Sequence, residues 1–385
     1  MKISLKRTPE QIELIKAMAS KNRDVAYEAQ VALAAFLGPV LAEVINNAPV
    51  LSNLFSPLSF NAEDNPSIPL DLYYDITDED YITIYSQQVA GGLPTNQVLP
   101  TTSEMKITTY RLDSALSFDK RYAAKSRMDV VSKTFTRMAQ EILAKQERTS
   151  GNLILSSLAA ASTNNKRHVQ RANATGRFLL QDMNELLTLS RRVFTSFTGG
   201  TMPTGQAGMG VTDLIISPEI EEELRAMAYN PINTKGVLAN TTSSIVDSGI
   251  TAPDSVRAGL FNGGGVSSFY GVNLMVFNEF GLTRKFNTIF DTVADTTSFA
   301  TANGTTLNTA FDGTKDELIL GINRNRESLI RAIAVDSETG SEFSLVADDQ
   351  YSIRQNKIGY FGSLEEGRMV LDNRALFGKI VRWTA

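Results

Sequence analysis

Residues 75–162 constrain the fold of this chain most, because a polar two-stranded arm is followed almost directly by a long helix. Side-chain types alternate along Tyr81–Ser86 and again along Met105–Tyr110, which is the period of a β-strand. The stretch between them contains Val89–Asn96, an open tip that is too long for a tight hairpin turn. We therefore expect Asp75–Leu112 to form a two-stranded arm.

This arm needs a surface to lie on, because an isolated two-stranded ribbon is only marginally stable in water. A dozen residues per strand would reach about 40 Å. One interpretation is an arm that reaches out to hold a neighbouring subunit. The alternative is a hairpin packed in the sheet of its own domain.

A helix is predicted from about Arg127 to Ala160, with an N-cap signature at Ser126 and Asp129. Its first apolar side chains recur at helical spacing, at Val131, Phe135, Met138 and Ile142. Only Gly151 interrupts the run, and an unbroken helix would be about 50 Å long. Two helices that meet near Gly151 are the alternative.

The N-terminal region contains two predicted helices. Thr8 suits the N-cap and Pro9 the first turn, with Gln11 at capping-box spacing. The second helix, Tyr27–Ile45, is more apolar, and Gly38-Pro39 should kink or break it. These helices form either an ordinary hairpin or an arm that packs on a partner. We expect neither a membrane span nor a secretory signal here.

Composition removes most of the usual equipment of an enzyme. The 385 residues contain no Cys and a single His, at position 168. Disulfides, zinc–thiolate sites and thiol nucleophiles are therefore excluded, and imidazole chemistry is limited to one residue. The content of 42% apolar and 21% charged residues is that of a soluble globular protein. The net charge of −5 argues against a broadly basic, phosphate-binding surface.

The rest of the chain alternates between helices and strands. Helices are predicted at Gln181–Phe197 and Glu219–Ala228, the second beginning after Ser217-Pro218. A strand with a bend at Gly271 is predicted for Ser268–Phe277. Thr288–Thr314 has the composition of polar strands or a surface insertion. Further strands are predicted at Val211–Ser217, Glu317–Leu320, Ser328–Val335, Ile353–Phe361 and Gly378–Trp383.

The short motifs that suggest chemistry are incomplete. Ser103 with Lys106, and Ser117 with Lys120, have β-lactamase spacing but lack the other elements of that site. Gly263–Gly265 leads into a strand and not into the helix of a phosphate-binding loop. The acidic residues 75, 78, 79 and 80 fail the EF-hand pattern. We therefore predict no catalytic, cofactor-binding or metal-binding residues.

One basic cluster stands out, formed by Lys166, Arg167, His168 and Arg171. It lies in Ser162–Gly176, which has the composition of a polar linker. A solvated linker, with His168 exposed, explains it. A contact with nucleic acid or with a carboxylate surface on a neighbour is the alternative. The cluster has no interleaved aromatic residues, so base stacking is not indicated.

The order of these elements resembles the major capsid proteins of tailed phages, which have the HK97-type fold. Thr212–Glu219 and the helix after it are similar to a strand-to-helix unit of that family's axial domain. Leu318–Ala334 and Tyr351–Val381 resemble the segment that closes the fold. The resemblance implies an α+β fold class and a subunit of a shell, and it is carried by topology and not by one diagnostic motif.

The same resemblance implies a division of the chain into five parts. These are an N-terminal arm (1–70), an extended β-hairpin loop (71–125), a peripheral domain with a spine helix (126–175), an axial domain (176–347) and a C-terminal return to the peripheral domain (348–385).

The function implied is a structural head protein that assembles into an icosahedral shell around double-stranded DNA. Its partners would be its own copies, in pentamers and hexamers, with scaffold, portal and decoration proteins and non-specifically contacted DNA, and no membrane or cofactor. The protein would reside in the virion after assembly in the host cytoplasm. No Lys lies between Lys21 and Lys106, so the loop tip cannot supply the Lys that crosslinks some family members, and we predict non-covalent contacts. An encapsulin-like nanocompartment and, from another class, a cytoplasmic α/β enzyme using carboxylates or Lys are the alternatives.

Overall fold

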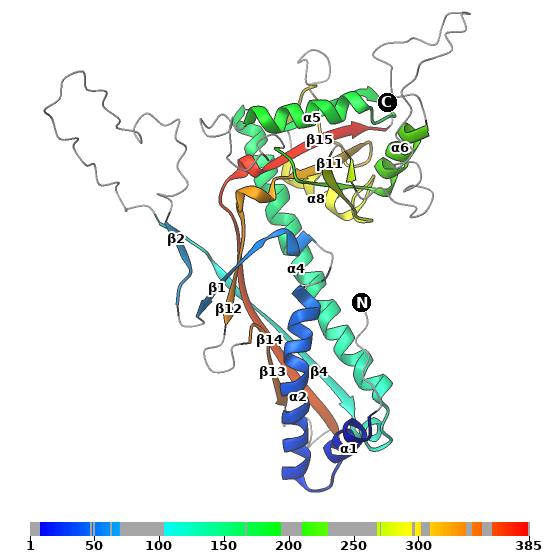
Figure 1. The fold of residues 1–385 in the computed structure, drawn as a ribbon, viewed down its shortest axis with the longest axis vertical. Coiled ribbons are helices and arrows are strands. Elements are labelled where there is room, and N and C mark those ends of the chain that lie inside the picture. Colours follow the sequence, from blue (N-terminus) through cyan, green and yellow to red (C-terminus); the bar gives the residue numbers. More distant parts are fainter. Residues whose placement is uncertain are drawn as a thin grey trace, which may run out of the picture. The chain divides into compact units, whose positions relative to one another are not determined.

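The computed structural model describes residues 8–46, 48, 51–61, 64–69, 104–165, 168–193, 210–229, 268–269, 271–294, 297–301, 309–335, 341–348 and 356–383. The outgoing strand and tip of the predicted arm, and Gly263–Gly265, lie outside these residues. The chain divides into two compact units (Figure 1). Unit 1 contains the described residues of Met1–Leu72, Pro100–Gly151 and Leu329–Leu371. Unit 2 contains those of Tyr73–Leu99, Asn152–Ser328 and Asp372–Ala385.

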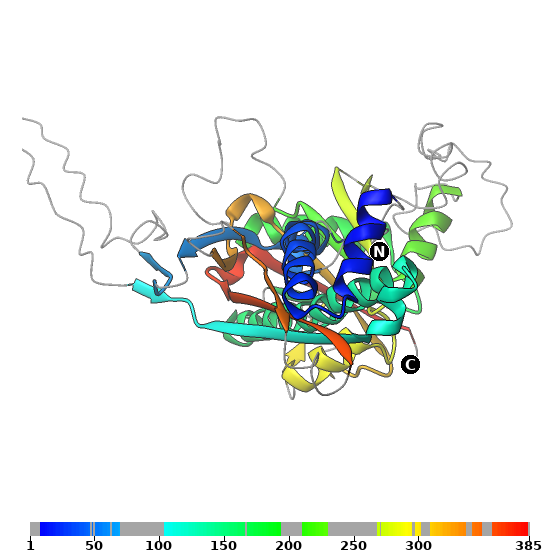
Figure 2. The same cartoon turned by 90° about the horizontal axis from the view of Figure 1, so that it is seen from below.

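Two helices open unit 1, as the sequence predicts. Helix α1 (Pro9–Met18) is capped by Thr8, whose hydroxyl accepts a hydrogen bond of 3.4 Å from the Gln11 amide. Helix α2 (Arg23–Asn46) lies beside α1 (Figure 2) and continues through Pro39. The expected break at Gly38-Pro39 is therefore wrong. Buried Leu33 and Leu37 before the proline, and Leu41 after it, hold both parts of α2 in one core.

Among the described helices, α2 alone is long and apolar enough to cross a membrane, and 44% of its most apolar stretch is buried. Its buried side chains belong to the core of unit 1, which also includes Phe135 and Tyr360. Gly38 and Pro39 interrupt the apolar run, but α2 still has the length and apolar composition of a membrane-spanning helix.

The sheet of unit 1 is built around β14 (Lys357–Val370), the longest described strand. On one side β4 (Thr109–Asp119) pairs with it in antiparallel register from Thr109 opposite Gly367 to Asp119 opposite Lys357. On the other side lie β12 (Leu329–Val335) and β13 (Ser344–Asp348). Strand β1 (Ser56–Asn61) extends the sheet in parallel with β12.

A single helix, α4 (Met128–Asn165), runs through Gly151, so the alternative of two helices is wrong. Its 38 residues correspond to about 57 Å at the usual helical rise. The apolar residues that predicted it, from Val131 to Ile142, are buried in the core of unit 1. Ser126 does not cap α4: it has a left-handed φ of 52°, and its buried hydroxyl has no hydrogen-bond partner. Short helix α3 (Lys120–Ala124) precedes it.

Unit 2 is built on a mixed sheet in the order β5, β15, β11, β6, β8, β7. The strands are β5 (Val169–Thr175), β15 (Leu376–Arg382), β11 (Asp316–Ile322), β6 (Asp213–Ile216), β8 (Val272–Val276) and β7 (Ser268–Phe269). Helices α5 (Leu180–Val193) and α6 (Pro218–Tyr229) pack on it. Helix α6 starts as predicted, because the Ser217 hydroxyl accepts from the Ile220 amide at 3.2 Å.

Two expectations about unit 2 are corrected. Part of Thr288–Thr314 is helical and not strand, because α8 (Lys285–Ala294) buries a stripe that includes Phe286 and Phe290. Among the described residues between α8 and β11, the strands are β9 (Ser298–Phe299) and β10 (Thr309–Ala310), of two residues each. The predicted strand at Ser268–Phe277 is instead two antiparallel strands that turn at Gly271, where φ is 78°.

The remaining elements complete the α+β class that the sequence predicts. They are the 3-10 helices η1 (Leu51–Leu54), η4 (Arg324–Arg326) and η5 (Asn373–Ala375), and the short strands β2 (Ser67–Pro69) and β3 (Glu104–Lys106). The C-terminal third of the chain contributes to both units. Leu329–Leu371 belongs to unit 1, and Asp372–Ala385 to unit 2, because β15 pairs with β11 and β5.

Candidate functional site: the polar cluster at the base of the arm

The described part of the arm is its base. Strand β2 pairs in antiparallel register with β3, and Ile68 lies opposite Met105. Beyond β3 the backbone amide of Ile107 donates a hydrogen bond of 2.9 Å to the Pro66 carbonyl. Two residues later the chain enters β4, so the return strand of the arm continues directly into the sheet of unit 1.

One side of the arm base is apolar. Ile68 and Ile107 form a buried cluster with Ile330 and Ala332 of β12. Gly367 of β14 permits this approach. A Cβ atom there would lie 2.8 Å from the Ile107 Cγ2 atom and 2.9 Å from the Thr108 carbonyl oxygen. Any larger residue would force the arm base or β14 to shift.

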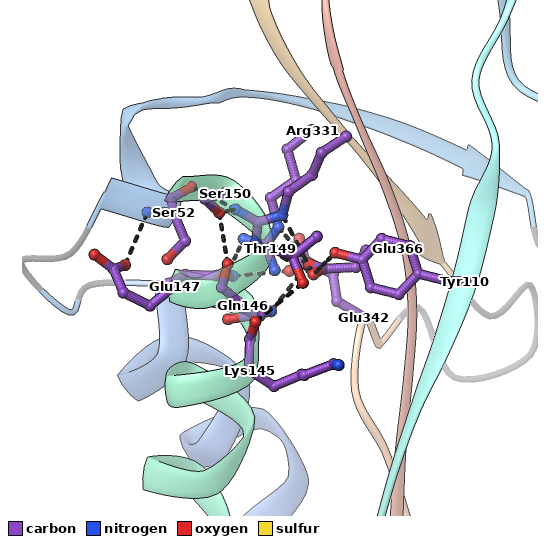
Figure 3. Close-up of polar contacts among 12 residues, drawn as sticks. Ser52, Tyr110, Lys145, Gln146, Glu147, Thr149, Ser150, Arg331, Glu342 and Glu366 are labelled. Carbon is purple, nitrogen blue, oxygen red and sulfur yellow. Dashed lines mark hydrogen bonds and ion pairs between the residues drawn. The ribbon is translucent and has the colours of Figure 1, made fainter. Parts of the chain in front are cut away.

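The other sheet face carries charge, because successive side chains of a strand point to opposite sides. Arg331 lies between Ile330 and Ala332, while Glu366 and Arg368 flank Gly367. Figure 3 shows Arg331 and Glu366 converging with Tyr110 of β4 and Gln146 of α4. We call Tyr110, Gln146, Arg331, Glu366 and Arg368 the Glu366 cluster.

The carboxylate of Glu366 is fully buried and accepts hydrogen bonds from every other member of the cluster. The donors are the Tyr110 hydroxyl at 2.8 Å, the Gln146 amide at 2.9 Å, the Arg331 Nε at 2.8 Å and the Arg368 guanidinium at 3.1 Å. One carboxylate thus joins β4, α4, β12 and β14.

The two arginines extend the network within unit 1. Arg368 donates to the Ser150 hydroxyl and to the Ser52 carbonyl, and its guanidinium lies 5.3 Å from the centre of the Phe55 ring. Arg331 donates to the Asn46 side chain at 2.9 Å, and Asn46 donates to Glu342 at 2.7 Å. The end of α2 and the segment just before β1 are therefore connected to the same carboxylate.

The electrostatics of the cluster favour a permanent charge. Burial by itself would raise the pKa of Glu366, but the guanidinium groups of Arg368 and Arg331 outweigh it and hold that pKa below its usual value. Burial, together with the Glu366 charge, raises the pKa of Tyr110 to about 12. Both groups therefore keep one protonation state near neutral pH. A group that transfers protons must instead change its protonation state near the working pH, so the cluster has the properties of a structural clamp.

The residues that the sequence singled out do not form a second site. Ser117 lies on β4 and Lys120 starts α3, while Ser103 and the acidic residues 75, 78, 79 and 80 lie outside the described residues. No group of three or more His, Asp or Glu side chains with metal-binding geometry occurs in the described part of the chain. The Glu366 cluster was not predicted. Its only sequence signal is the run Glu365-Glu366-Gly367-Arg368 within an otherwise strand-like stretch.

The predicted basic linker is wrong for the two members that the structure describes. His168 is buried: its Nδ1 lies 3.0 Å from the Leu376 carbonyl, and its ring stacks on Phe377. Arg171 is buried on β5, where it pairs with Asp316 at 2.8 Å. Arg382 pairs with the same carboxylate at 2.7 Å. These side chains hold the sheet of unit 2 together and are not a nucleic-acid surface. Lys166 and Arg167 lie outside the described residues.

A second buried pair in unit 2 was also missed. The Lys379 ammonium group is fully buried and lies 2.7 Å from Glu185 and 3.7 Å from Asp182, both on α5. Burial by itself would raise the pKa of Glu185, but Lys379 and Asn173 lower it overall. Trp383, at the end of the predicted strand Gly378–Trp383, donates a hydrogen bond of 2.6 Å to Glu317.

The sequence matches no protein-family model and no curated protein. Solved structures that resemble the chain include the SrpI encapsulin of Synechococcus elongatus, with 13% identity, a TM-score of 0.43, and coverage of 87% of this chain and 88% of that one. Another is the capsid of Cyanophage P-SCSP1u, with 11% identity, a TM-score of 0.46 and coverage of 88% and 89%. The mature capsid of bacteriophage PhiM1 has 11% identity, a TM-score of 0.43 and coverage of 87% of each chain.

Proposed function

We propose that the chain is the major capsid protein of a virus head with the HK97-type fold. In this proposal, copies of the chain assemble without covalent links into an icosahedral shell that encloses double-stranded DNA. Unit 1, with residues 128–151 of α4 as its spine, corresponds to the peripheral domain, and unit 2 corresponds to the axial domain. Scaffold, portal and decoration proteins are further partners, and the shell contacts the packaged DNA non-specifically.

The observation that carries the proposal is the fixed base of the arm. Burying one carboxylate between two guanidinium groups has a large desolvation cost, and replacing such a group by apolar residues is often neutral or stabilising. A buried charged cluster offsets this cost with a benefit if it fixes the positions of the strands and helices that it joins. Here the geometry is the point where β3 enters the sheet beside β14. A fixed base suits an arm that acts on a neighbouring copy.

The described chemistry supports a structural role. The cluster holds an ionised carboxylate and a neutral phenol with no nucleophile–base pair. The single His of the chain is buried against Phe377 and bonded to a backbone carbonyl. The mild net charge of −5 is compatible with a wall around packed DNA, since a basic wall would bind the duplex and hinder its packing.

Expression of the full chain, followed by negative-stain microscopy and light scattering, tests this function. Closed shells tens of nanometres across are the expected result. A small discrete oligomer with a ligand-responsive melting temperature would favour the enzyme alternative and contradict the proposal. The cargo of the particles separates the two kinds of shell: packaged DNA indicates a virus head, and an enclosed enzyme indicates a nanocompartment.

A further inference from the structure

Glu317 on β11 is a buried acid that is only half satisfied. Its side chain is fully buried, beside a sheet face whose core includes Ile319 and Ile220. Trp383 donates its indole hydrogen to Oε2 at 2.6 Å. The other oxygen, Oε1, has no hydrogen-bond partner of good geometry among the described residues. An unpaired buried carboxylate oxygen carries a substantial desolvation cost.

The neighbouring acid, Asp316, shows which partners a buried carboxylate needs when both of its oxygens are hydrogen-bonded. Asp316, whose side chain lies on the opposite face of β11, pairs with Arg171 and Arg382 and also accepts from the Asp312 amide. Burial by itself would raise the pKa of Asp316, but its two arginines lower it overall. No cationic side chain is paired with Glu317 among the described residues.

Burial and the Glu219 charge oppose the ionisation of Glu317, whereas the Ser217 hydroxyl and the Trp383 indole favour the ionised form. From α6, the Glu219 carboxylate repels a second negative charge, and the Ser217 hydroxyl before that helix compensates only in part. Immediately before β11, the Lys315 carbonyl accepts a hydrogen bond of 3.0 Å from the Trp383 amide, which adds a backbone contact to the Trp383 side-chain bond. Burial is the largest effect and raises the pKa of Glu317 to about 7.

We propose that Glu317 is a proton-binding switch that sets how firmly Trp383, and with it the end of β15, is held against β11. When protonated, Glu317 is a neutral buried acid whose hydroxyl can donate to Ser217. When the proton leaves to solvent, the indole still donates to the carboxylate, but this hydrogen bond does not offset the burial of the charge, so ionisation favours an opened arrangement in which water replaces Trp383. This switch goes beyond the proposed shell function and does not depend on it.

The sole tryptophan of the chain, Trp383, reports on the switch directly. The full-length protein is titrated from pH 5 to pH 9, and its fluorescence is excited at about 295 nm to avoid the tyrosines. We expect one transition with a midpoint near pH 7, with emission shifting to longer wavelength at higher pH. In Glu317→Gln the transition should be absent. A flat wild-type titration, or a transition that persists in Glu317→Gln, would overturn the proposal.

A second pair of variants keeps the test decisive if Glu317→Gln does not fold. Glu219→Gln removes the facing charge on an exposed residue, so the midpoint should move to lower pH. Glu222→Gln, on an exposed position of the same helix, should leave the midpoint unchanged. Equal midpoints in Glu219→Gln and Glu222→Gln would contradict the proposal.

His168 needs its own control, because the usual pKa of an imidazole, 6.5, lies within the scanned range. Burial lowers the pKa of His168 below its usual 6.5, so its protonation belongs to a more acid range. The variant His168→Gln should therefore retain the transition near pH 7. Loss of that transition in His168→Gln would assign it to the imidazole and overturn the role of Glu317.

Discussion

At the scale of single residues, this protein buries charge in two different ways. Glu366 and Asp316 are each held by two arginines and stay ionised. Glu317 has no cation beside it within the described residues, and burial raises its pKa. The difference lies in the partners and not in the depth of burial, because all three carboxylates are fully buried. Substitutions at these positions therefore have different consequences.

Replacement of Glu366 by Gln should destabilise unit 1 strongly. The amide keeps the shape of the side chain but leaves the Arg331 and Arg368 charges buried without a counter-charge. The free energy of unfolding, measured by urea denaturation, should fall by about 3–5 kcal/mol.

The matched control is Glu141→Gln, which breaks an exposed pair with Arg137 on α4. That change should reduce the free energy of unfolding by less than about 1 kcal/mol. A similar loss in both variants would mean that the Glu366 cluster contributes no more than a surface ion pair.

The same carboxylate predicts a loss of stability in acid. The folded-state pKa of Glu366 lies below its usual value of 4.5, so the folded state binds its proton less tightly than the unfolded chain does. Its contribution to stability is therefore fully present above pH 4.5 and is lost as the pH falls through the folded-state value.

Unfolding free energies measured between pH 3 and pH 6 test this linkage. The wild-type protein should lose stability more steeply below pH 4.5 than Glu366→Gln does. Parallel curves for the two proteins would show that this carboxylate is not linked to folding.

At the scale of elements, local sequence patterns correctly predicted the features that depend on a few neighbouring residues, such as where a helix starts. Thr8 and Pro9 located the start of α1, and Ser217 with Pro218 located the start of α6. The stepped apolar residues from Val131 onward predicted α4. Each of these signals acts over a few residues, so the sequence displays it directly.

Other features depend on partners far away in the chain and were missed. Glu366 meets Tyr110 at a separation of 256 residues and Gln146 at 220. His168 and Arg171 have the appearance of a solvated linker until β5 is placed beside β15, where Leu376 and Asp316 become their neighbours. The start of α8 was missed because Thr and Asn dominate its surroundings, although Phe286 and Phe290 have helical spacing.

Gly367→Ala tests how the arm base is seated on the sheet. The added methyl group would lie closer to Ile107 and Thr108 than real contacts allow, so one of the two strands must shift. We expect a loss of about 1–3 kcal/mol in unfolding free energy and faster proteolysis near residue 104.

Gly313→Ala provides the comparison, since a Cβ atom there meets its nearest neighbour, Asp291, at 3.4 Å. Its cost should be smaller than that of Gly367→Ala. If Gly367→Ala is neutral in both stability and proteolysis, close approach of the arm does not require this glycine.

At the scale of the whole molecule, the proposed shell depends on the arm. Deletion of Val89–Pro100 shortens its tip and leaves β2, β3 and the Glu366 cluster in place. We expect the variant to remain folded by circular dichroism but to fail to form closed shells in negative stain. Normal shells from the deletion variant would show that the arm tip is not a clamp between subunits.

The pairing of β4 with β14 has a mechanical consequence. The chain passes from β3 into β4, and β4 is hydrogen-bonded to β14 along its whole length. A pull on the arm is therefore directed along the strand, and all hydrogen bonds of the ladder resist it together instead of opening one after another. A force that a neighbouring subunit applies to the arm would therefore be transmitted through β4 to β14 before the hydrogen bonds between these two strands break.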